Sequence, residues 1–143
     1  MDSLDRKILA LLSADARAST TQLARRLKVA RSTVQTRIRR LEETGTIAGY
    51  TLRLGAGVHA RRIRATALLQ VEPRAGAGVV NRLRALPQVE AAHSCSGRFD
   101  LVLQLVCETT RQLDEVLDRI GAIPGVRASE SLIHLSTRFD RTL

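Results

Sequence analysis

The first 45 residues contain three stretches in which apolar residues recur with the period of an α-helix. We expect helices over residues 3–14, 20–27 and 30–45, the last one ended by Gly45. Ser19 and Gln22 have the spacing of a capping box, which predicts that the second helix begins at Thr20. The three helices are expected to share an aliphatic core, formed by Leu4, Ile8, Leu11, Leu12, Leu23, Leu27, Val34, Ile38 and Leu41.

Beyond Gly45 the helical period ends. Residues 46–54 combine β-branched side chains with alternation, which predicts a short strand, and the glycine-rich residues 55–60 indicate a linker. A domain boundary is therefore expected near residue 60, with one domain over residues 1–60 and a second over residues 61–143.

The second domain begins with a different period. From Arg61 apolar residues alternate with polar ones, as in a half-buried strand, until Pro73 stops the pattern. Helical periodicity returns over residues 76–86 and 110–123. Further strands are predicted over residues 89–96, 99–108 and 128–137, so the element order is β-α-β-β-α-β.

An internal repeat supports this order. The pattern V-x-x-R-x-x-A-x-P-x-V begins at Val79 and recurs 37 residues later from Val116. Each copy spans a helix end, a proline that stops it and the first apolar residue of the next strand. Two such halves indicate the α+β ferredoxin-like fold, a four-stranded antiparallel sheet with both helices on one face. The other face has no cover within the chain, which predicts a homodimer.

The outer face of the third predicted helix is basic and polar. Three residues, Lys28 to Ala30, separate this helix from the second, as in a helix-turn-helix whose second helix enters the major groove of DNA. Gln35 is the best candidate for reading a base, because glutamine makes bidentate contacts with adenine. We expect Arg31, Ser32, Thr33, Gln35 and Thr36 to face the groove and Arg37, Arg39 and Arg40 to lie nearer the phosphates. The alternative is an amphipathic helix that is merely solvated.

The charge distribution agrees with a polyanionic partner. The formal net charge is +9, and residues 1–60 carry 11 Lys and Arg against 5 Asp and Glu. Residues 61–143 carry 12 against 9, so the basic excess follows the helix-turn-helix. Binding to double-stranded DNA should therefore weaken as salt is added. With one Tyr, two Phe and no Trp, the chain lacks the aromatic platforms on which single-stranded nucleic acids stack.

No pattern of metal ligation or nucleophilic catalysis is present. Cys95 and Cys107 are expected to be buried or half-buried thiols on strands, and the histidines His59, His93 and His134 are dispersed singly. No cofactor, metal or catalytic residue is therefore expected. The N-terminus lacks the layout of a signal peptide and no segment suits a membrane span, so we expect a cytoplasmic protein.

Four segments stand in an order that is specific when taken together: LDRKILALLSADARAS, QLARRL followed by TRIRRLEETGTIAGY, SGRFDLVL and AIPGVRASES. In this combination the chain resembles the Lrp/AsnC, or feast/famine, family of bacterial and archaeal transcription regulators over nearly its whole length. The resemblance implies an N-terminal helix-turn-helix, a β linker and a C-terminal domain that dimerises. It also implies that this domain often assembles into octamers and commonly senses amino acids.

The same resemblance implies an effector site at the predicted hairpin. Glycine lets a ligand approach the backbone, and the carboxylate of Asp100 can accept hydrogen bonds from a ligand ammonium group. The expected site comprises Gly97, Arg98, Phe99, Asp100, Ser129 and Ser131, with Ser136 and Thr137 as further hydroxyls. The alternative is that the hairpin residues only form and pack a turn.

The chain departs from the family pattern in the turn of the helix-turn-helix. Lys28 stands where the family usually has Gly, so it is expected to adopt a left-handed conformation at a cost of about 1 kcal/mol. Ala30 stands where the family usually has Ser, and the missing cap is expected to cost about 0.5–2 kcal/mol.

Together these features predict a sequence-specific transcriptional regulator whose assembly or DNA affinity responds to an amino acid or similar metabolite. The alternative is an enzyme similar to the sirohaem decarboxylases, which resemble the same two-domain family and whose C-terminal histidines are implicated in activity. His93 and His134 keep that alternative open. The arginine-rich helix argues against it, because such an enzyme needs no basic recognition helix.

Overall fold

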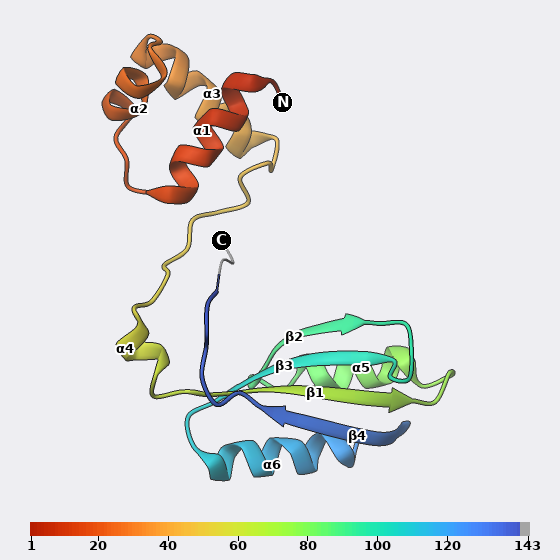
Figure 1. The fold of residues 1–143 in the computed structure, drawn as a ribbon. Coiled ribbons are helices and arrows are strands. Elements are labelled where there is room, and N and C mark those ends of the chain that lie inside the picture. Colours follow the sequence, from red (N-terminus) through yellow and green to blue (C-terminus); the bar gives the residue numbers. More distant parts are fainter. Residues whose placement is uncertain (141–143) are drawn as a thin grey trace. The chain divides into compact units, whose positions relative to one another are not determined.

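The computed structural model describes residues 1–140 and forms two compact units that divide between Arg53 and Leu54 (Figure 1). The division comes a few residues before the boundary expected near residue 60. The reason is that a short helix, α4 (Ala56–His59), is grouped with the second unit.

Three helices make up the first unit, as predicted: α1 (Ser3–Ala14), α2 (Thr20–Leu27) and α3 (Arg31–Glu43). The expected capping box starts α2, with the Gln22 amide donating to Ser19 Oγ at 3.1 Å and the Ser19 amide donating to Gln22 Oε1 at 3.0 Å. The predicted core is confirmed at its centre, where Ile8, Leu23 and Val34 are fully buried.

The expected strand over residues 46–54 was a wrong prediction. These residues form neither helix nor strand, and the following stretch contains α4 rather than an irregular linker. A strand depends on hydrogen bonds to a neighbouring backbone, and no strand pairs with this segment within residues 1–140. Its alternating apolar side chains, Tyr50, Leu52 and Leu54, are consequently exposed.

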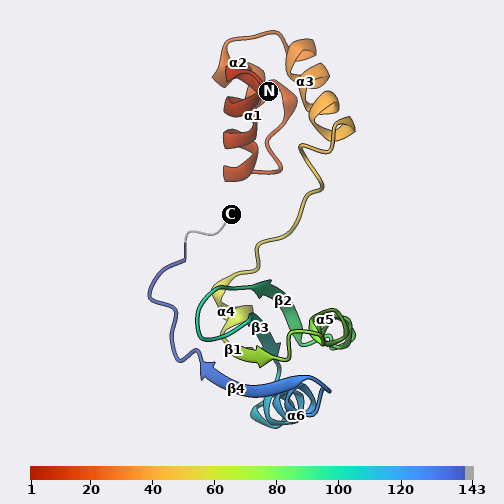
Figure 2. The same cartoon turned by 90° about the vertical axis from the view of Figure 1, so that its right-hand side faces the viewer.

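A four-stranded antiparallel sheet forms the second unit, in the order β2-β3-β1-β4. The strands are β1 (Ile63–Val71), β2 (Val89–Ser94), β3 (Leu101–Cys107) and β4 (Val126–Ile133). Two helices, α5 (Gly76–Arg84) and α6 (Thr110–Gly121), connect them and lie on one side of the sheet (Figure 2). The predicted ferredoxin-like order is confirmed, although β4 begins and ends earlier than the 128–137 we expected.

The two central strands, β1 and β3, show how the period-two pattern gives the sheet one buried face. Every second residue of β1 and β3 is buried under the helices, from Ala65 to Val71 and from Leu101 to Cys107. The intervening side chains are half-buried and partly polar, and Thr66 on β1 bonds Gln104 on β3 across this second face at 3.3 Å. The helices of this unit therefore cover one face of the sheet only.

Gly125 joins α6 to β4 at a point where the backbone packs closely against the start of α5. Its φ is +100°, and a Cβ placed there would lie 2.3 Å from the Cβ of Ala75, at the start of α5. The Glu72 amide donates to the Gly125 carbonyl at 2.8 Å, which ties the end of β1 to the same turn. Glycine is required here for both its conformation and its lack of a side chain.

We expect Gly125→Ala to destabilise the protein by about 2–4 kcal/mol, since it adds backbone strain to a steric clash. Gly121→Ala is the matched control, because that position has an ordinary φ and a methyl group added there would have no atom within 4 Å. Thermal unfolding followed by circular dichroism measures both. Adding Ala75→Gly should recover part of the loss, and equal melting temperatures for the two single variants would contradict this account.

Candidate nucleic-acid interface

The turn between α2 and α3 has the conformation that the sequence suggests. Lys28 is left-handed, with φ 56° and ψ 43°, and its position after α2 is that of a C-cap. The Val29 amide donates to the Ala24 carbonyl at 3.1 Å, and Ala24 itself is buried where the two helices pack. Ala30 caps α3 without any side-chain hydrogen bond, as expected. The turn therefore forms despite two residues that do not favour it.

The side chains of α3 separate into three sectors around the helix axis. At about 100° per residue, Val34, Ile38 and Leu41 occupy a narrow sector that faces the core. Five of the predicted DNA-binding residues share an arc of about 140° outside this sector, and the arc runs from Arg31, next to Ile38, to Thr36. They are the exposed residues Arg31, Ser32, Gln35, Thr36 and Arg39, which we call the free arc.

The other three predicted residues lie between the free arc and the core. Thr33 is half-buried, and Arg37 and Arg40 turn toward the N-terminus of α1. Arg37 Nη1 lies 3.1 Å from Asp5 Oδ1 and also pairs with Asp2, while Arg40 Nη2 lies 2.7 Å from Asp5 Oδ2. We call these two arginines and two acids the acid–arginine cluster.

The acids of the cluster also begin α1. Asp2 and Asp5 form a reciprocal capping box, in which each backbone amide donates to the other's carboxylate at 3.0 Å. We did not predict this cap, although the D-x-x-D spacing before an apolar helical pattern was a visible signal. Asp5 is 0% exposed, so its charge depends on these partners inside the unit.

Hydrogen bonds within the cluster shift the pKa values of its members. The pKa of Asp2 is lowered from 3.8 to about 2, mainly by the Asp5 amide and next by the Arg37 guanidinium. The pKa of Asp5 is also lowered, mainly by the Asp2 amide, while burial opposes that shift. The pKa of Arg37 is raised by its bonds to the two carboxylates. All of these shifts favour the charged forms.

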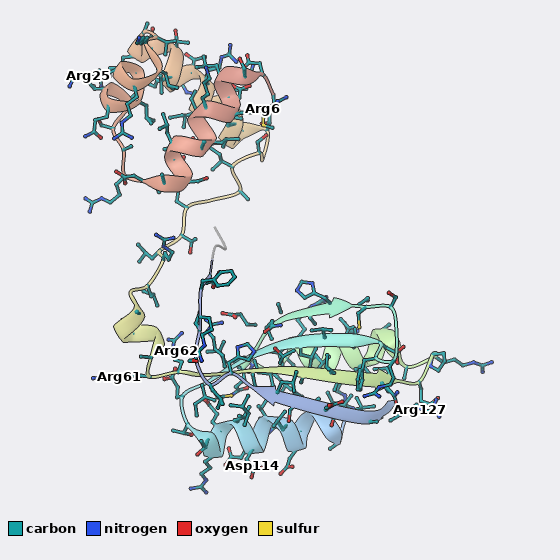
Figure 3. All side chains as sticks on the ribbon, in the orientation of Figure 1. Arg6, Arg25, Arg61, Arg62, Asp114 and Arg127 are labelled. Carbon is teal, nitrogen blue, oxygen red and sulfur yellow. The ribbon has the colours of Figure 1, made fainter. Side chains whose placement is uncertain are left out.

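Further cations lie close to the free arc in the chain and were not among the predicted site residues. Arg25, Arg26 and Lys28 are exposed at the end of α2 and in the turn, and none of them pairs with an acid of residues 1–140. Figure 3 shows Arg25 extending outward from α2 and Arg6 from α1. Two consecutive arginines, Arg25 and Arg26, stand just before the turn, and this pair could have been recognised in the sequence.

The predicted effector hairpin is anchored to β1. The Asp100 amide donates to the Leu69 carbonyl at 2.8 Å, and Asp100 Oδ2 accepts from the Val71 amide at 2.8 Å, where the pairing of β1 with β4 shifts register. Gln70 Nε2 donates to the Arg98 carbonyl at 2.9 Å. One oxygen of the Asp100 carboxylate therefore has a structural partner.

The remaining predicted effector residues are only partly brought together. Gly97 has a φ of +113°, and the Arg98 guanidinium lies 5.2 Å from the centre of the Phe99 ring. Arg98 also lies 3.5 Å from Glu130 on β4. Ser129 and Ser131 flank Glu130 along the strand, so their side chains point to the opposite face of the sheet. Ser136 and Thr137 follow the end of β4 and are exposed.

Cys95, Cys107, His93 and His134 do not form a second site among the described residues. Cys107 is buried on β3, as expected, and burial raises its pKa, whereas Cys95 is exposed just beyond β2. His134 Nε2 bonds the Thr66 hydroxyl at 2.8 Å, and His93 is exposed on β2. Residues 1–140 hold no cluster of three His, Cys, Asp or Glu side chains that suits a metal ion. No helix in this range is long and apolar enough to cross a bilayer.

The acid–arginine cluster makes the first unit sensitive to acid. A carboxyl whose pKa is lowered by folding stabilises the folded state above its unfolded pKa and loses that contribution as the pH falls through its folded pKa. For Asp2 this window runs from 3.8 down to about 2. We expect Asp2→Asn to melt at a lower temperature than the wild type at pH 6, and the gap to close toward pH 2. A gap of the same size at both pH values, measured by circular dichroism, would contradict the assignment.

Comparison with known proteins gives both units a family. The model of the AsnC-type helix-turn-helix domain matches residues 1–42, and that of the Lrp/AsnC ligand binding domain matches residues 64–143. The HTH-type transcriptional regulator FL11 of Pyrococcus horikoshii is 28% identical and covers 99% of this chain and 94% of its own length. The HTH-type transcriptional regulator LrpA of Mycobacterium tuberculosis is 31% identical, over 93% of this chain and 89% of its own.

A solved structure gives the same result. The feast or famine regulatory protein of M. tuberculosis, complexed with L-methionine, is 31% identical, with a TM-score of 0.87 over 99% of this chain and 97% of that chain. The matched families and these relatives are transcriptional regulators, so the enzyme alternative that rested on His93 and His134 finds no support. With a helix-turn-helix unit and a ligand-binding unit both matched, this chain belongs to the Lrp/AsnC family of transcriptional regulators.

Proposed function

We propose that the protein recognises a specific sequence in double-stranded DNA through the free arc of α3. One exposed arc holds two arginines, one glutamine and two hydroxyl side chains, and this observation carries the proposal. Side chains of these types bind phosphates and the edges of bases. Gln35 lies within this arc and remains the residue we assign to base recognition. Arg31 and Arg39 are the first and last residues of the free arc along the helix axis, so they can contact phosphates at different points of the groove.

Cations outside α3 would strengthen this binding without adding specificity. Arg25, Arg26 and Lys28 carry three positive charges close in the chain to the start of α3. Charges of this kind steer a protein to DNA and hold it through phosphate contacts. Duplex binding should therefore be strongly dependent on salt.

We propose further that the protein works as a homodimer formed through the sheet face that α5 and α6 leave uncovered. That face carries Leu68, Val102 and Val106 between polar side chains, and the exposed Leu132 of β4 adds to it. A dimer would present two copies of α3 to successive major grooves, roughly 34–36 Å apart or a multiple of that distance, on a near-palindromic site. Assembly of such dimers into octamers is what membership of the family leads us to expect.

The effector we propose is an amino acid or a similarly small metabolite at the 97–100 hairpin. The L-methionine bound by the M. tuberculosis relative makes an amino acid the first candidate. Asp100 Oδ2 already accepts from the Val71 amide, which leaves Oδ1 for a ligand ammonium group. Binding would change assembly or the spacing of the two α3 helices and shift DNA affinity by about 1–3 kcal/mol. A regulator of this kind acts on the chromosome, so we place it in the cytoplasm.

Replacing Gln35 and Arg39 together by Ala should abolish binding to a duplex selected by the wild-type protein from a random library. Both side chains are exposed, so the fold and the oligomeric state should not change. Gel-shift titration and light scattering measure the two properties. Loss of the oligomer, or an unchanged affinity for the selected duplex, would contradict the placement of the free arc on DNA.

Asp100→Asn is expected to remove the response to the effector and to leave the fold intact. Asparagine keeps an oxygen to accept from the Val71 amide but removes the charge that an ammonium group needs. A thermal-shift panel of the twenty amino acids, run with a size measurement, first identifies the responding ligand on the wild type. A variant that still responds to that ligand would exclude Asp100 as its charged partner.

A further inference from the structure

We propose that Arg37 is a positioning residue for the recognition helix, held by Asp2 and Asp5 of α1 and thereby withheld from DNA phosphates. This inference rests on the proposed DNA binding by the free arc. It also revises the expectation that Arg37 lies near the DNA phosphates. The acids that begin the chain would set the specificity of a helix that lies some thirty residues further on.

The buried carboxylate of Asp5 is the centre of the arrangement. Its Oδ1 accepts from Arg37 Nη1 at 3.1 Å and its Oδ2 from Arg40 Nη2 at 2.7 Å. The same Nη1 of Arg37 also bonds Asp2. Because Asp5 is 0% exposed, removing either arginine leaves its buried carboxylate with one guanidinium partner in place of two.

The balance of charge distinguishes Arg37 from its neighbours on α3. Two arginines and two aspartates make the cluster neutral overall, so it adds nothing to the attraction of polyanions. The side chain of Arg37 is 27% exposed and bonds both acids, whereas that of Arg40 is 51% exposed and bonds one. Arg39, in contrast, is exposed within the free arc and pairs with no acid of residues 1–140.

Specificity needs this anchor because the apolar contact of α3 is narrow. Val34, Ile38 and Leu41 form a single stripe, and a helix held along one stripe can roll about its own axis. The acid–arginine cluster holds the flank of the helix and limits that roll. Base readout by Gln35 requires donor and acceptor atoms to be placed within hydrogen-bonding distance, so a small roll costs specific contacts more than phosphate contacts.

The test compares full-length variants on two duplexes, one selected by the wild type from a random library and one with the same base composition in scrambled order. Affinity is measured at several salt concentrations between 50 and 200 mM. Arg39→Gln is the matched control, and it should lower the salt slope by about 0.9, a change of roughly three- to fourfold across this range. Arg37→Gln should leave the slope on the scrambled duplex unchanged and weaken the selected duplex by about tenfold.

Two further variants test the acids. Asp5→Asn removes the one acid that Arg40 bonds, which frees Arg40 to contact a phosphate. This variant should therefore bind the scrambled duplex more tightly, with a steeper salt slope, and discriminate less between the duplexes. Asp2→Asn should act in the same direction and more weakly. Because the Asp2 side chain is 51% exposed, this variant still reports if Arg37→Gln proves to be unfolded by circular dichroism.

The outcomes separate the inference from the function on which it rests. If Arg37→Gln flattens the salt slope as Arg39→Gln does, without changing discrimination, Arg37 is a phosphate contact and the inference is overturned. Unchanged affinity and discrimination in Asp2→Asn and Asp5→Asn would overturn it as well. If selection with the wild type enriches no sequence from the random library at 50 mM salt, the proposed DNA recognition itself fails.

Discussion

The contact of the Asp5 carboxylate with two arginines of α3 is the interaction on which the DNA-binding unit depends. It places a full negative charge in a position without solvent access, and that charge is tolerated because two guanidinium groups and a backbone amide surround it. The same contact decides how the charge of α3 is divided. One part is neutralised inside the unit and fixes the helix, and the other part stays on the free arc. The same four side chains therefore hold the helix and, in the function we propose, leave its free arc to the DNA.

In the second unit an aspartate also has a structural partner, but here the carboxylate is bonded to a backbone amide and not to arginines. The 97–100 hairpin lies at the end of β1, where the register with β4 shifts, and Asp100 provides a carboxylate oxygen for the Val71 amide there. A ligand that engages the other oxygen of Asp100 would act on the end of β1, which is one of the two central strands of the sheet. From that position a ligand could influence the uncovered face, through which we propose that the homodimer forms.

Much of the fold was predictable from the sequence because the periods were clear. Aliphatic residues at helical spacing, the Ser19–Gln22 cap and the strict alternation of β1 and β3 each depend on local contacts and were found as expected. The expected strand at residues 46–54 was wrong. Alternation predicts only that one side of the segment is apolar, whereas a strand also requires a neighbouring strand with which its backbone can form hydrogen bonds. Pairing partners are a property of the tertiary structure, or of an assembly, and a single sequence does not name them.

The location of the candidate site could be predicted from the sequence, but the roles of its individual side chains could not. The basic face of α3 was visible in the sequence, but the eight expected DNA-binding residues could not be divided between solvent and structure, because Asp2 and Asp5 are distant along the chain. Likewise, Ser129 and Ser131 share a strand with Glu130 yet face away from its contact with Arg98. Sequence spacing identified the segments, and only the register and the ion pairs show which side chains meet.

A crystal structure of the protein on its selected duplex would test the central claim most directly. The account predicts that Arg31, Gln35 and Arg39 face the major groove while Arg37 remains bonded to Asp5. Arg37 turned toward a phosphate, or a surface other than the free arc against the DNA, would contradict it.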